Sequence, residues 1–148
     1  MRDGLSKIQV KRAHSPYYYG ANTAWMSEII DVQGYDSLTF LMAIGTVVDA
    51  DATFVVLMQE SDSPTFATAN DVADSDMVSQ TRGTQAETAA AFQFDDDDEV
   101  RAIGYIGTKR YVRLYVTPAN NTGYANVGIM AILDRPNPAN APITHGAS

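Results

Sequence analysis

Five consecutive carboxylates, Asp95 to Glu99, are the densest cluster of residues in the sequence that could do chemistry. They lie in the run FDDDDEV (94–100), between two apolar segments. An EF-hand calcium loop needs alternating acids, a glycine at its turn and a bidentate glutamate at the twelfth position, and this run has neither that glycine nor that spacing. Neighbouring side chains of an extended chain point to opposite faces, so four successive aspartates cannot all converge on one ion.

Three interpretations of this acidic run stay open. It is a solvated turn between strands, a looser calcium site that uses Asp95 and Asp97 with backbone carbonyls, or an acidic contact for a basic partner surface. We expect the run to lie on the surface and to be independent of metal. No other pattern in the sequence implies a cofactor.

Catalytic residues for hydrolysis are poorly represented. The two histidines, His14 and His145, lie in segments that we expect to be an arm and a tail, where a general base would be badly held. No G-x-S-x-G nucleophile elbow is present, and Gly104 and Gly107 in GYIGTKRY match no phosphate-binding loop, so they predict a turn or bulge. No carboxylate sits in an apolar stretch that would raise its pKa for glycoside hydrolysis. We predict that the protein is not an enzyme.

The composition limits the compartment and the partners. The chain has 148 residues, 45% hydrophobic, which suits one globular domain, and it has no cysteine for disulfides or thiolate zinc sites. It shows no secretory signal and no apolar stretch near the length of a membrane span, so we expect cytoplasmic assembly and no membrane partner.

Charge is distributed unevenly along the chain. Residues 1–12 carry a net +3, residues 13–100 a net −15 and residues 101–148 a net +4, which together give −8. An acidic body repels phosphates, so we expect no nucleic acid partner. The basic ends could contact acidic surfaces, including the acidic middle of a second copy.

The strongest hydrophobic pattern has a period of two, which is typical of β-strands. Clear strands are predicted at 38–44, 53–60, 110–117 and 125–133, with weaker ones at 26–32, 89–95 and 100–107. We expect a helical turn within 71–79, capped by Asp71 or Asp74, and a loop leading into a strand at 84–91. No sustained helical stripe is present.

These elements predict an all-β fold: a single β-sandwich, with a jelly roll as the expected architecture. The expected division is an extended N-terminal arm (1–24), a β-sandwich domain (25–133) and an extended, proline-rich C-terminal tail (134–148). We expect one shared core for the following residues: Leu38, Phe40, Val55, Leu57, Val112, Leu114, Val116, Ile129 and Ile132.

Aromatic and basic residues mark a candidate protein interface. Three consecutive tyrosines could stack on sugars or nucleobases, but with an acidic body nearby we favour a protein interface, with packing in the core or the arm as the alternative. The candidate interface residues are Tyr17, Tyr18, Tyr19, Trp25, Lys11, Arg12, Arg110, Arg113 and Arg135.

Two longer stretches resemble a known family. They are VVLMQESDSPTFATANDVADSDMV (55–78) and RAIGYIGTKRYVRLYVTPANNTG (101–123), the second leading into a final apolar strand. Together they resemble the small jelly-roll cement, or head decoration, proteins of tailed bacteriophages with HK97-like capsids. The resemblance covers roughly residues 26–135 in overall pattern, without a catalytic motif.

The resemblance implies a non-enzymatic virion protein on the capsid exterior, which binds the outer surface of the major capsid protein lattice and stabilises the head. It also implies self-association, for which we expect a dimer rather than a trimer. The alternative is a tail-associated or carbohydrate-binding β-sandwich module of a virion, because one fold serves both functions. An exposed groove lined by the tyrosines or by Trp25 would favour sugar binding, and a flat, multi-sided contact surface would favour cement.

Overall fold

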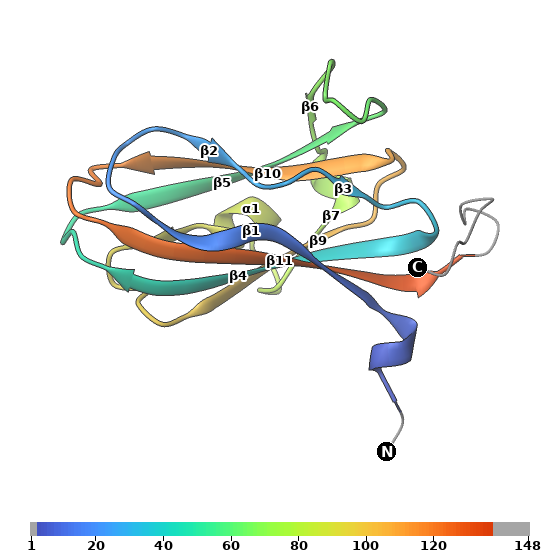
Figure 1. Ribbon diagram of the computed structural model, residues 1–148, viewed down its shortest axis with the longest axis horizontal. Coiled ribbons are helices and arrows are strands. Elements are labelled where there is room, and N and C mark those ends of the chain that lie inside the picture. Colours follow the sequence, from blue (N-terminus) through green and yellow to red (C-terminus); the bar gives the residue numbers. More distant parts are fainter. Residues whose placement is uncertain (1–2, 138–148) are drawn as a thin grey trace.

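The computed structural model describes residues 3–137, which form two antiparallel sheets packed face to face (Figure 1). The first sheet contains, in spatial order, β1 (Gln9–Tyr19), β11 (Ala125–Pro136), β4 (Tyr35–Val47), β9 (Val100–Tyr105) and β7 (Met77–Ser79). The second sheet contains β2 (Trp25–Met26), β3 (Ile30–Asp31), β10 (Tyr111–Ala119), β5 (Thr53–Ser61), β6 (Asn70–Asp71) and β8 (Phe92–Gln93). The short helices are η1 (Leu5–Lys7), η2 (Asp74–Asp76) and α1 (Ala86–Ala90).

The strand order is that of a jelly roll. The short strands β2 and β3 both pair with β10, and β6 and β8 both pair with β5, so each of these couples occupies one strand position. With the positions numbered along the chain, the sheets read 1-8-3-6 and 2-7-4-5, and β7 adds an edge strand to the first. Successive positions along the chain mostly alternate between the two sheets, as two interlocked Greek keys require. The predicted all-β jelly-roll sandwich is confirmed.

The core lies between the two sheets and follows the period of two. On β4, Leu38, Phe40, Met42 and Ile44 point inward and are buried, which makes this central strand the axis of the core. Val112, Leu114 and Val116 of β10 face them from the second sheet and are fully buried. The predicted core is therefore confirmed for both of these strands, and also for Ile129 of β11.

The predicted phase of β5 is wrong. Val55 is 60% exposed and Leu57 is only partly buried, whereas Phe54, Val56 and Met58 fill the core. The run TFVVLM is apolar on both faces, so its composition does not distinguish the inner from the outer side chains. On β11, Ile132 likewise lies on the outer face, and its neighbours Ala131 and Leu133 are buried.

The predicted N-terminal arm is mostly a strand of the sandwich. Residues 9–19 form β1, which pairs with β11 from Gln9–Leu133 to Tyr19–Ala125, and Ala13 is fully buried. Two register shifts, between Arg12 and His14 and between His14 and Tyr17, accommodate Pro16 in this edge strand. The sandwich therefore begins near residue 9 and not at 25. It extends to Pro136, past the predicted boundary at 133, and the rest of the predicted tail, 138–148, lies outside the described residues.

A short helix closes one edge of the sandwich. Helix α1 covers one edge, where Ala86 and Ala90 are buried and Glu87 Oε1 accepts a hydrogen bond from the Met58 backbone N–H at 2.7 Å. This corrects the expectation of a loop at 84–91, because Gln85 caps the helix by accepting a hydrogen bond from Thr88 N. The expected helical turn within 71–79 is present as η2, without a side-chain cap from Asp71 or Asp74.

No helix within residues 3–137 is long and apolar enough to cross a membrane.

Candidate protein interface

The outer face of the first sheet is apolar, and we call it the β4 face. Because Leu38, Phe40 and Met42 point inward, Thr39, Leu41 and Ala43 of β4 point outward. The registers of β11 and β9 set the outward residues of the flanking strands beside them. The β4 face consists of Val10, Thr39, Leu41, Ala43, Val78, Val100, Ala102, Gly104, Met130 and Ile132.

Charges lie at the margins of the β4 face. Arg12 of β1 pairs in register with Met130 and stands at one edge, and Asp134 stands at the end of β11. Met130 is 45% exposed, and Val10, Val78 and Val100 are also exposed. A contiguous apolar surface rimmed by polar residues typically marks a contact site.

The outer face of the second sheet is also partly apolar, and we call it the β5 face. It consists of Met26, Val55, Leu57, Tyr115 and Thr117, which are joined across β2, β10 and β5. A loop covers one end of this face, where the buried Phe66 lies under the Arg113 guanidinium at 4.3 Å from the ring centroid. Arg113 Nε also donates to Gln59 Oε1 at 3.0 Å. The protein therefore presents apolar surface on two opposite sides.

The predicted aromatic residues have different environments. Tyr17 is 63% exposed on β1, while the side chains of Tyr18 and Tyr19 lie outside what the structure describes. Trp25 is only 7% exposed, since its ring stacks on His14 inside the sandwich edge. This corrects the expectation that Trp25 is a surface residue. His14, for its part, is held within a strand, which corrects the expectation of a poorly held side chain; His145 lies outside the described residues.

The predicted basic residues do not form one patch. Lys11 and Arg12 lie on β1, where Arg12 pairs with Glu28 at 3.9 Å. Arg110 makes a bidentate pair with Asp31, with distances of 3.0 and 2.9 Å from Nε and Nη2. Arg135 is exposed near the end of β11, with a φ of 55°.

The Arg110–Asp31 pair has an electrostatic signature. Burial raises the pKa of Asp31, but hydrogen bonds from Arg110 and from the Gln33 backbone outweigh that effect and hold the pKa below its usual value. The hydrogen bond and charge of Asp31 in turn raise the pKa of Arg110. Arg110 therefore pairs with Asp31 of the same molecule, and this pair joins β3 to the start of β10.

The acidic run 95–99 is a structured surface turn, as the sequence predicts for its location. Asp96 Oδ2 accepts from Gln93 N at 2.8 Å, and Asp97 Oδ1 accepts from Val47 N at 3.1 Å. Arg101 pairs with Asp96 at 2.8 Å and also with Glu99. These carboxylates thus anchor the turn to β4 and to Arg101.

The structure offers no preformed metal site in the part it describes. Within residues 3–137, no group of three or more histidine and carboxylate side chains is arranged to hold a metal ion. A shallow hollow of about 420 Å³ lies beside β1, lined by His14, Ser15, Tyr17, Met26, Ser27 and Glu28. Among the described residues, Tyr17 and His14 contribute rings to this hollow, and sugar binding usually relies on exposed ring faces. Lack of enzymatic activity stays a prediction.

The two apolar outer faces cannot be recognised from the sequence alone. Their members are ordinary strand residues, such as Leu41, Ala102 and Met130, and none belongs to a motif. What makes them a surface is the cross-strand register, which no single segment reveals. The signal in the sequence is that residues 38–44 and 53–60 are apolar at both alternating sets of positions. Such a composition is typical of strands that are covered on both faces.

Comparisons with known proteins define the fold class. No protein-family model matches the sequence, and no curated protein matches it. A chain of the T13 viral particle of infectious bursal disease virus matches 92% of this chain, with a TM-score of 0.52 and 10% identity. A chain from the structure of the Gx strain of that virus matches 87%, with a TM-score of 0.51 and 8% identity. This chain covers 32% of the length of each viral chain.

A prophage protein has a similar size. The SPBc2 prophage-derived protein YomS matches 84% of this chain and 92% of its own length, with a TM-score of 0.48 and 14% identity. At such identities, the two viral matches show a common fold and nothing more specific. The chain therefore belongs to the class of jelly-roll sandwiches that is also found in viral particles.

Proposed function

We propose that this protein is a non-enzymatic structural component of a bacteriophage virion, a cement or decoration protein of the head. It binds the outer surface of the major capsid protein lattice and also contacts copies of itself. Its location is the capsid exterior, and assembly takes place in the host cytoplasm. Neither nucleic acid nor membrane is a partner, in keeping with the net charge of −8.

The observation that carries the proposal is the pair of apolar faces on opposite sides of an acidic protein. A single binding partner needs one such face, whereas a protein that joins a lattice and its own neighbours needs several. The jelly-roll fold and the resemblance of residues 55–78 and 101–123 to phage cement proteins support the same function.

Stabilisation of the head follows from linkage. A protein that binds only the assembled lattice lowers the free energy of that lattice by RT ln(1 + [L]/Kd) at each site. At a free concentration one hundred times Kd, this is about 2.7 kcal/mol per site. Many sites per capsid would raise the temperature of head disruption strongly.

The test measures binding of purified protein to undecorated capsids. We expect saturable binding, with a copy number comparable to that of the major capsid protein, and a higher temperature of capsid disruption. Val55→Glu places a charge on the exposed β5 face, and Leu41→Glu does so on the β4 face; at least one of them should reduce decoration. Ala50→Glu, in the exposed β4–β5 turn, adds the same charge away from both faces and is the matched control.

Failure to bind capsids of its own virus would contradict the proposal. If such a protein instead bound host surface polysaccharide or purified tails, the alternative of a tail-associated or carbohydrate-binding module would take its place. Tight binding with equal affinity for all three variants would show that the two apolar faces are not the contact surfaces.

A further inference from the structure

The β4 face has an asymmetric arrangement of large and small side chains. In one cross-strand row, Ile132 of β11 and Gly104 of β9 flank Thr39 of the central strand. In the next row, Met130 and Ala102 flank Leu41. In both of these rows the large residue lies on the β11 side and the small residue on the β9 side, so this part of the face has a ridge beside a trough. In the following row the order is reversed, because Gly128 of β11 and Val100 of β9 flank Ala43.

The trough is a real hollow in the surface. Thr39, Val78, Gly104 and Ile106 are among the residues that line a depression of about 310 Å³. Gly104 contributes no side chain, and a Cβ atom at this position would lie only 3.0 Å from Val78 Cβ. The depression therefore lies over a position without a side chain, against which Val78 packs closely.

We infer that a second copy of the chain stacks on the β4 face, around a two-fold axis that runs parallel to β4. Rotation about this axis places β11 of one copy over β9 of the other. Leu41 then meets Leu41 of the second copy, Met130 covers Ala102, and Ile132 enters the trough at Gly104. Each large residue meets a small one twice, as an isologous interface requires, and the close packing of a protein interior becomes possible.

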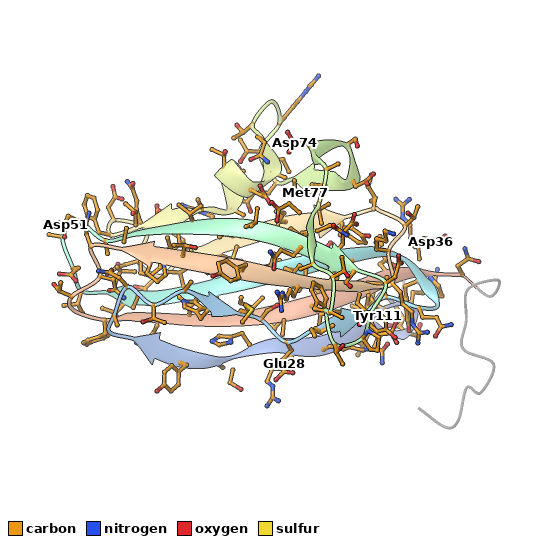
Figure 2. All side chains as sticks on the ribbon, turned by 90° about the horizontal axis from the view of Figure 1, so that it is seen from above. Glu28, Asp36, Asp51, Asp74, Met77 and Tyr111 are labelled. Carbon is orange, nitrogen blue, oxygen red and sulfur yellow. The ribbon has the colours of Figure 1, made fainter. Side chains whose placement is uncertain are left out.

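Charge at the margins favours the same axis. The β1 edge carries Lys7 and Arg12, of which Arg12 is paired with Glu28, and the opposite edge carries Asp74 and Asp76 of η2. Figure 2 shows Asp74 at one long edge of the molecule and Glu28, the partner of Arg12, at the other. An axis parallel to β4 sets the β1 edge of each copy over the η2 edge of the other, so opposite charges approach one another.

The other in-plane axis, perpendicular to the strands, gives a poorer interface. It stacks β1 on β1, so the two Arg12 side chains approach each other, and β11 on β11, so in the row of Leu41 Met130 meets Met130 and Ala102 faces Ala102 across a void. Like charges across an interface are unfavourable, and voids forfeit packing contacts. The occupant that fits is therefore a second copy in the first orientation.

The size of the face limits the area that the two copies can bury. Five strands at roughly 4.8 Å spacing, over about 20 Å of strand length, give a footprint of about 500 Å² per copy. The total buried area is then about 1,000 Å², near the lower limit for a specific interface and in the range of weak, transient contacts. This inference deepens the self-association within the proposed function, and its test uses purified protein without capsids, so the two can fail separately.

The first experiment is sedimentation equilibrium of the full chain between 1 μM and 1 mM. We expect a concentration-dependent rise from 16.0 kDa towards twice that mass. Leu41→Glu, at the axis, should weaken dimerisation at least 100-fold, and circular dichroism should show that the variant is folded. Ala50→Glu, in the exposed β4–β5 turn and outside both apolar faces, is the matched control and should leave the dimer constant unchanged within two-fold.

The second experiment tests the orientation. The chain has no cysteine, so Val10→Cys and Val78→Cys each introduce a single thiol, on β1 and β7. A short bismaleimide should link an equimolar mixture of the two variants into a covalent dimer, and should link neither variant alone. A persistent monomer at 1 mM, equal loss from both Glu variants, or efficient linking of Val10→Cys to itself would overturn the inference.

Discussion

The imidazole of His14 stacks on the indole of Trp25, with ring centroids 4.6 Å apart and planes inclined by 22°. His14 belongs to β1 of the first sheet, and Trp25 belongs to β2 of the second. The backbone N–H of Glu28 also donates to the carbonyl of Ala13 at 2.6 Å. These contacts close the edge of the sandwich that α1 does not reach, and they fix an N-terminal strand in place.

This stacking predicts a loss of stability at mildly acidic pH. Burial lowers the pKa of His14 below its usual 6.5, against a smaller opposing effect of Glu28. Since the folded pKa is depressed, the stabilisation is fully present above pH 6.5 and is lost as pH falls through the folded value. We expect the urea midpoint of the protein to decrease between pH 7.5 and 5.0.

The control for this prediction is His14→Phe, which keeps an aromatic ring on Trp25 and removes the titrating group. Its urea midpoint should change less over the same pH interval, because the buried imidazole of His14 then no longer contributes to the slope. Identical slopes for the two proteins would show that His14 carries no part of the pH dependence.

A second prediction concerns a side-chain hydrogen bond between the two sheets. The Tyr105 hydroxyl of β9 donates to Glu60 Oε2 of β5 at 2.7 Å. Tyr105→Phe should lower the free energy of unfolding by about 1.5–3 kcal/mol, as for hydrogen bonds to charged groups. Glu60→Gln keeps an acceptor and should cost less in the same denaturation measurement, and the reverse order would contradict this reading of the pair.

The same hydroxyl predicts an alkaline limit. Burial raises the pKa of Tyr105, and the hydrogen bond to Glu60 raises it further. With a raised folded pKa, the stabilisation is complete below the unfolded value of 10.0 and is lost as pH rises above it. Guanidinium denaturation at pH 9 and pH 11 should show a steeper decline for the natural chain than for Tyr105→Phe.

A third prediction separates the inner and outer side chains of the second sheet. Leu114→Ala removes a fully buried side chain and should cost about 2–5 kcal/mol, through lost burial and the cavity that it leaves. Val55→Ala, on the β5 face, should change stability by less than about 0.5 kcal/mol. Comparable losses would mean that β5 has the opposite phase.

A fourth prediction tests the anchoring of the acidic turn. Arg101→Gln removes the partner of Asp96 and Glu99, and it should destabilise the protein by about 1 kcal/mol at low salt. Screening should reduce the difference in 1 M sodium chloride. Thermal unfolding of both proteins at the two salt concentrations measures this, and a salt-independent difference would indicate lost packing instead of lost charge pairing.

A fifth prediction concerns metal. Three of the aspartates accept hydrogen bonds from Gln93 or Val47, and Arg101 pairs with the turn, so the carboxylates already have partners. We expect millimolar calcium to shift the melting temperature by less than about one degree at constant ionic strength. A shift of several degrees that is lost when Asp95 and Asp97 become Asn would establish a calcium site.

The fold class was accessible from the sequence because alternation in long strands is a local property. The alternation within each segment is enough to identify the buried side chains. These are Leu38, Phe40 and Met42 in one strand and Val112, Leu114 and Val116 in another. The phase of Val55 and Leu57 was not accessible, since both faces of that strand are apolar and the choice depends on the registers with β10 and β8.

The role of residues 9–19 was hidden for a different reason. An edge strand has one neighbour, and this one buries chiefly Ala13 and contains Pro16 within a bulged region, so its composition resembles that of an extended arm. The candidate interface was likewise inaccessible, because the pairing of Met130 with Leu41 and of Leu41 with Ala102 joins three segments that are distant in sequence.

The pairing of Gln9 with Leu133 has a consequence for biosynthesis. During translation β1 leaves the ribosome early, but its neighbour in the sheet, β11, follows only after all the other strands. Until then the nascent chain cannot complete the first sheet, and β4 lacks one of its two neighbouring strands. Such non-local pairing makes folding slow and leaves intermediates that are prone to aggregation. A chaperone that holds the growing polypeptide, or synthesis at low temperature, should therefore raise the yield of native protein more than a faster rate of expression would.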